Sequence, residues 1–186
     1  MNTNWLLILL ILVVLIALVR KKKPVIVSHW HNLVPGLHVS VEDYYEALDA
    51  VIEMRKVPEV KTWVTHYHEG GITSAKRMYL RVSRRDHIFD ICAAPFGTDF
   101  FVSWWLGEKM KPFAALINGI PFLGPALVKM FSPETFYRID TALMFQDSVH
   151  SAVLEVLDER MKGQGLRLLS VSERKPIMRE LFKQGR

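Results

Sequence analysis

Two pairs of histidines in this sequence have a spacing that could support metal chemistry. His29 and His31 flank a tryptophan, and His66 and His68 flank a tyrosine. On a strand, residues two apart point to the same side, so each pair could offer two imidazole nitrogens to one ion. Four such nitrogens would suit zinc or a similar divalent metal. The alternative is that these histidines are solvated or hydrogen-bonded strand residues, since no carboxylate motif completes a site.

Two other groups are weaker candidates for chemistry. Asp147 and His150 would share one side of a helix, as in helical metal sites, but a polar helix face explains a single pair better. Cys92 would need a base to act as a nucleophile, and His87 lies an odd number of residues away, on the opposite face of the same strand. We therefore expect Cys92 to be a core residue. No serine-hydrolase, Walker or dinucleotide motif is present, so no cofactor is expected beyond the alternative of a divalent metal.

Arginine and aromatic residues alternate along one predicted strand. Arg77, Tyr79 and Arg81 would share a face, and Trp63, Tyr67, Trp104 and Trp105 lie on neighbouring strands. Such a face can bind single-stranded nucleic acid, a partner protein or lipid headgroups. The net charge is +5, but the residues Arg20, Lys21, Lys22 and Lys23 supply four of those charges. Because the remainder is nearly neutral, we expect no nucleic-acid binding.

The N-terminus predicts a membrane anchor. Residues 5–19 are unbroken apolar residues, and the basic cluster Arg20, Lys21, Lys22 and Lys23 follows directly. Positive charge after the apolar run, without a small-residue cleavage site, favours a retained helix over a signal peptide. Basic residues stay on the cytoplasmic side, so the N-terminus is expected outside and residues 24–186 inside. Trp5 and the basic cluster would lie at the two membrane interfaces. A single cysteine suits a reducing compartment.

The elements that would position the candidate residues form an α+β protein. A helix is predicted at residues 40–55 with Ser40 as its N-cap, followed by a four-stranded antiparallel meander at residues 60–68, 75–83, 87–94 and 100–106. A short strand could lie at residues 25–28. A long amphipathic helix capped by Ser132, a short strand at 166–170 and a helix at 177–183 complete the chain. The predicted divisions are an anchor (1–19), a basic flank and connector (20–39), an α+β lobe (40–108), an apolar segment (109–131) and a C-terminal helical region (132–186).

Residues 112–131 allow three interpretations. The segment is almost as apolar as the N-terminal run, but three prolines and two glycines interrupt it. It could be a buried helix–turn–helix, an interfacial hairpin in the membrane or a second span.

These features predict a single-pass, membrane-anchored protein with a cytoplasmic domain of unknown biochemical role. The favoured function is a protein-interaction or membrane-associated scaffold module, whose partners would be membrane lipids and a protein partner or a second copy. The alternative is a membrane-bound metal-dependent enzyme that gathers His29, His31, His66 and His68 in one pocket. Enzymatic activity is left open.

Overall fold

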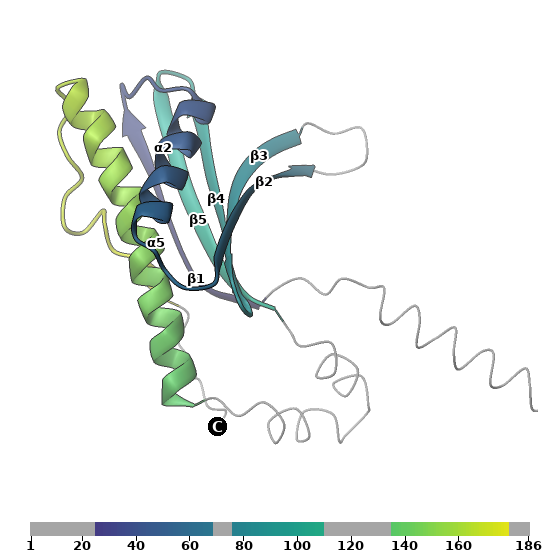
Figure 1. Cartoon of the computed structure of the whole chain (residues 1–186). Helices are drawn as coiled ribbons and strands as arrows, with labels where there is room; N and C mark the ends of the chain where they lie inside the picture. Colours follow the sequence, from purple (N-terminus) through teal and green to yellow (C-terminus); the bar gives the residue numbers. More distant parts are fainter. Residues whose placement is uncertain (1–24, 69–75, 110–134, 179–186) are drawn as a thin grey trace, which may run out of the picture.

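The computed structural model describes residues 25–68, 76–109 and 135–178. They form one six-stranded antiparallel sheet, in the order β2-β3-β4-β5-β1-β6, with two helices on one of its faces (Figure 1). The strands are β1 (Val25–Pro35), β2 (Val60–His68), β3 (Lys76–Arg84), β4 (His87–Phe96), β5 (Asp99–Glu108) and β6 (Ile177–Met178). The helices are α2 (Val41–Met54) and α5 (Phe136–Gly163).

The first strand has the largest effect on the topology. β1 pairs with β5 along its whole length and also carries the two residues of β6 on its other side. Its register shifts between Ile26 and Ser28, which marks a β-bulge. A bulge breaks the strict alternation of side chains, so two neighbouring residues can face the same side of a sheet.

The helix α2 forms where the sequence places a cap and an apolar stripe. The Ser40 side chain accepts a hydrogen bond from the Asp43 backbone N–H at the N-terminus of the helix. Tyr44, Tyr45 and Leu48 are buried against the sheet and α5. The Tyr45 hydroxyl accepts a hydrogen bond from the Ala93 N–H, which ties the helix to β4.

The long helix α5 lies beside α2 on the same face of the sheet (Figure 1). Its N-cap is Thr135, whose side chain accepts a hydrogen bond from the Arg138 N–H. Its second half is closely packed: Val149, Ala152, Val153, Val156 and Leu157 belong to the core cluster. No helix or strand of the described ranges covers the other face of the sheet, where Trp63 and Trp105 are partly exposed.

The predicted fold class is wrong in its architecture. The strands at residues 60–68, 75–83, 87–94 and 100–106 correspond to β2–β5, but the sheet has six strands, because β1 and β6 extend it. β1 continues to Pro35 instead of ending at Ser28. Residues 166–170 form no strand, and the chain at Ile177–Met178 is a strand instead of the start of a helix. The cap of α5 is Thr135, and Ser132 lies outside the described residues.

The membrane predictions are also corrected. In residues 25–68, 76–109 and 135–178, no helix is long and apolar enough to cross a membrane. The single-pass anchor, the N-terminus-out orientation, the cytoplasmic-domain localisation and the membrane-anchored scaffold therefore have no support in the structure. Trp5, Arg20, Lys21, Lys22 and Lys23, and the apolar segment at 112–131, lie outside the described residues. The proposed domain divisions stay predictions.

Candidate binding cavity

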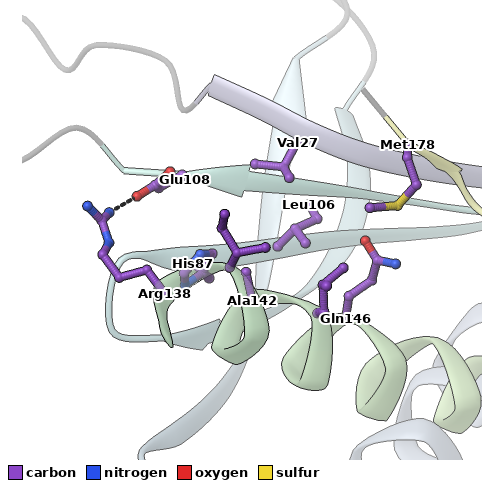
Figure 2. A pocket seen from close by; sticks show the side chains of 10 residues that line it. Val27, His87, Leu106, Glu108, Arg138, Ala142, Gln146 and Met178 are labelled. Atoms are coloured by element: carbon purple, nitrogen blue, oxygen red, sulfur yellow. Dashed lines mark hydrogen bonds and ion pairs between the residues drawn. The ribbon is translucent and has the colours of Figure 1, made fainter. Parts of the chain in front are cut away.

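A cavity lies between the first half of α5 and the sheet, with a free volume of about 70 Å³ (Figure 2). Residues spaced three and four apart on α5 form one wall, because this spacing places side chains on one helix face. They are Arg138, Ile139, Ala142, Leu143 and Gln146. The sheet forms the other wall with Val27, His87, Leu106, Glu108 and Met178, so four strands contribute. Most of the lining is apolar.

The β-bulge in β1 shapes the inner wall of the cavity. Val27 lines the cavity, and the next residue, Ser28, is buried and donates a hydrogen bond from its hydroxyl to Gln146 Oε1 on α5. In a regular strand these neighbours would face opposite sides of the sheet. The register shift between Ile26 and Ser28 lets both side chains face the helix. The bulge thus supplies one apolar and one polar group to the same wall.

One end of the cavity is charged. Arg138, in the first turn of α5, forms an ion pair with Glu108 at the end of β5 (Figure 2). Each side chain is about one-third exposed, so water screens the pair in part. The pair joins the helix to the sheet at this end.

His87 lies near the same charged end, at the start of β4. Burial lowers the pKa of His87, while the nearby carboxylates of Glu108 and Asp86 oppose this shift. The imidazole is therefore neutral near pH 7 and offers one hydrogen-bond donor and one acceptor.

Gln146 lies toward the other end of the cavity, near Met178 (Figure 2). It is only 4% exposed. Its carbonyl oxygen accepts the hydrogen bond from Ser28, while its NH₂ group has no hydrogen-bond partner among the described residues. The Ser28 hydroxyl can donate or accept, so it can satisfy only one end of this amide whichever way the amide is oriented.

His150 has a structural role in the core. Trp104 Nε1 donates a hydrogen bond to His150 Nδ1 over 3.1 Å, which leaves the proton of the neutral ring on Nε2. His150 Nε2 lies 2.7 Å from the Arg174 carbonyl oxygen and donates to it. Burial lowers the pKa of His150. The polar helix face expected for His150 is therefore wrong, because this histidine is buried among aromatic rings.

The structure does not bring the two histidine pairs together. His29 and His31 lie on β1, while His66 and His68 lie on β2, with β3, β4 and β5 between them. Four strand spacings of about 4.8 Å separate the two strands by roughly 19 Å.

The pairs also lie on opposite faces of the sheet. His29 is paired with Trp105 on the face away from the helices, and His66 is paired with Met78, which packs against the core. The metal-dependent enzyme with four histidines in one pocket is therefore wrong. Within the part of the chain that the structure describes, no three His, Cys, Asp or Glu side chains are grouped to hold a metal.

Cys92 is a buried free thiol, but it is not part of the core cluster: it lies beside Tyr79 on the sheet face away from the helices, so the prediction of a core residue is correct only in its burial. Burial raises the pKa of this thiol, so the reactive thiolate is disfavoured.

The arginine and aromatic residues of the open sheet face bind one another. Arg81 Nε and an NH₂ nitrogen lie 2.6 and 2.8 Å from the two carboxylate oxygens of Asp90. The guanidinium also lies over the rings of Trp63 and Tyr67, with its carbon 5.9 and 5.6 Å from the ring centroids. Arg81 is thus already paired inside the protein. An interaction of this face with a partner protein stays a prediction.

Sequence reasoning missed the cavity completely. Its residues come from five elements spread between Val27 and Met178, and none of them belongs to a recognisable motif. One signal was present: Gln146 interrupts an apolar stripe on α5, and a buried amide in such a stripe needs a polar partner.

Comparisons with known proteins add no function. No protein-family model and no curated protein sequence matches this chain. A crystal structure of TTHA0849 from Thermus thermophilus is similar over 73% of this chain and 97% of that chain, with 14% sequence identity and a TM-score of 0.27. A similarity this low supports no conclusion, so the function has to be argued from the residues of this chain.

Proposed function

We propose that this protein binds a small, predominantly apolar molecule in the cavity between α5 and the sheet. The observation that carries the proposal is the cavity itself: a mainly apolar hollow of about 70 Å³ between α5 and the sheet, partly open to solvent. A concave, mainly apolar space with a few polar groups is the usual form of a small-molecule site.

The size of the cavity limits the ligand. One ordered water needs about 10–15 Å³ of such space, so the cavity has room for about five waters. A compact molecule of about six or seven non-hydrogen atoms fills a space of this size. Benzene and phenol are therefore suitable probes.

The test is a titration of the full-length chain with benzene and with phenol, followed by NMR. We expect the amide signals of Leu106, Ala142 and Met178 to shift and to saturate. In the variant Ala142→Leu, the new side chain would occupy the cavity, so the shifts are expected to disappear while the protein remains folded. The matched control is Met144→Leu on the exposed side of α5, which should bind as the unaltered chain does. Equal binding by Ala142→Leu, or no binding by the unaltered chain, would overturn the proposal.

A further inference from the structure

Two buried polar side chains in the cavity have hydrogen-bonding capacity that the protein does not use. Gln146 is 4% exposed and His87 is 9% exposed. The Gln146 NH₂ group and both ring nitrogens of His87 have no hydrogen-bond partner among the described residues. Neither residue is among those whose side-chain polar atoms are fully shut off from solvent without a partner, so water or a ligand in the cavity can reach these groups and hydrogen-bond to them.

The two polar groups lie at different places along the cavity. Gln146 is two helical turns beyond Arg138 on α5, and Figure 2 shows it on the Met178 side, away from the Glu108–Arg138 pair. His87 belongs to the charged end, beside Glu108 and Arg138. Apolar side chains, among them Leu106 and Ala142, lie between them. A ligand that fills this space therefore meets an apolar middle and a hydrogen-bonding group toward each end.

The charges around the cavity cancel. Glu108 and Arg138 are paired with each other, and His87 is neutral near pH 7. A charged ligand would have to leave water for a mainly apolar space in which no protein group of opposite charge is available to it, unless it broke the Glu108–Arg138 ion pair. An uncharged ligand has no such cost.

Resting on the proposed function, we infer that the ligand is a small uncharged alcohol, phenol or ketone whose oxygen binds the Gln146 amide. A hydroxyl or carbonyl oxygen accepts from the NH₂ group of Gln146, and a hydroxyl or carbonyl at the other end can pair with the His87 imidazole. Plain hydrocarbons leave both groups unsatisfied. Carboxylates introduce a charge that the cavity does not balance.

The experiment compares three ligands that share one ring: benzene, phenol and benzoate. Each is titrated into the full-length chain at pH 7 and its affinity is measured by NMR. We expect phenol to bind about three- to tenfold more tightly than benzene, the effect of one net hydrogen bond. Benzoate, which is charged and also larger than phenol, is expected to bind more weakly than both.

The variant Gln146→Met tests the role of the amide at nearly constant side-chain volume. We expect the affinity for phenol to fall to that for benzene, with the affinity for benzene unchanged or slightly higher. The control Met144→Leu, on the exposed side of the same helix, should keep the full preference for phenol. Since the order of the three ligands on the unaltered chain is a test of its own, the inference stays falsifiable even if Gln146→Met does not fold.

The outcomes separate this inference from the proposed function. Equal binding of benzene and phenol, or a retained preference for phenol in Gln146→Met, would overturn the inference and leave a cavity that binds apolar molecules. Tightest binding of benzoate would show that Arg138 selects an anion, which also overturns it. If none of the three ligands binds, the proposed function itself fails.

Discussion

Residues 136–146 and 149–161 belong to the same helix, α5, yet they meet the sheet in different ways. In the second half, Val153, Val156 and Leu157 are fully buried. In the first half, Phe136 is 85% exposed, and Ile139, Ala142 and Leu143 line the cavity. Both halves carry apolar residues at helical spacing, so the hydrophobic pattern alone does not explain the difference.

The position of α2 explains it. Tyr44 of α2 donates a hydrogen bond to the Val153 carbonyl, and Arg55 binds the Ser148 carbonyl and the Glu155 carboxylate. These contacts place α2 against the second half of α5, so that α2, α5 and the sheet together enclose the core there (Figure 1). Among the described residues, the first half of α5 faces the sheet without this second helix. The comparison teaches that a cavity can persist where one helix alone covers a twisted sheet.

The largest expected difference between the halves comes from removing a leucine. Leu157→Ala should lower the free energy of unfolding by about 2–5 kcal/mol, because it opens a new cavity in close-packed surroundings. Leu143→Ala should cost about 1 kcal/mol, since Leu143 is partly exposed and borders a space that already exists. Urea unfolding of both variants measures the two values, if the dependence of the unfolding free energy on urea concentration is the same in both. Similar losses would show that the two halves are packed alike.

The reverse change, a larger side chain, should also affect the two halves of α5 differently. Ala152 is fully buried in the second half, and Ala152→Leu should destabilise the protein by about 1–3 kcal/mol through overpacking. Ala142→Leu, ten residues earlier on the same helix, should be neutral or stabilising because the cavity has room for it. Thermal unfolding by circular dichroism compares the pair. A loss of stability in Ala142→Leu equal to that in Ala152→Leu would contradict the cavity.

The buried histidine of the second half predicts a dependence of stability on pH. His150 has a lowered pKa in the folded state, so the unfolded chain binds the proton more readily. Stability should therefore be complete above about pH 6.5 and fall as the pH decreases below it, by at most about 1.4 kcal/mol per pH unit for this group. His87 shifts in the same direction and adds to the slope.

Urea unfolding between pH 5 and pH 7.5 tests this dependence on the unaltered chain and on His150→Gln. The variant removes one titrating group, so its stability should change less with pH, although the contribution of His87 remains. An identical slope in both proteins would mean that His150 is not kept neutral by its burial and by the Trp104 hydrogen bond.

The smallest expected difference concerns one ion pair from each half. Arg174 binds both carboxylate oxygens of Asp158 at 2.9 and 2.8 Å, whereas Arg138 and Glu108 form a more exposed pair. Double-mutant cycles should give a coupling of roughly 1–3 kcal/mol for Arg174 with Asp158. The coupling of Arg138 with Glu108 should be below about 1 kcal/mol and should decrease in high salt. A stronger coupling at the cavity would mean that this end is less solvated than its exposure indicates.

Local signals predicted α2 and β2 to β5, but they misplaced a strand at 166–170 and the start of a helix at Ile177. Ser40 before an acidic first turn marked the start of α2, and alternation with intervening turns located β2 to β5, because caps and strand periodicity depend on neighbouring residues. The burial of Cys92 also followed from its strand. β1 was recognised only in part, since two prolines and a glycine near residues 24–36 resemble a connector.

Only the tertiary structure decided what the elements do together. The sheet order separates His29 and His66 by four strand spacings and by the two faces of the sheet, although the His-x-His motifs are alike in sequence. The cavity arises where a bulge in β1, the end of β5 and the first half of α5 converge. Strand order, register shifts and helix contacts link residues far apart in the chain, such as Ser28 with Gln146 and Trp30 with Glu173, which are 118 and 143 positions apart, and no local pattern encodes such contacts. The sequence by itself determined which residues are apolar and which are polar. Long-range pairing of strands and helices determined which of them line the same cavity.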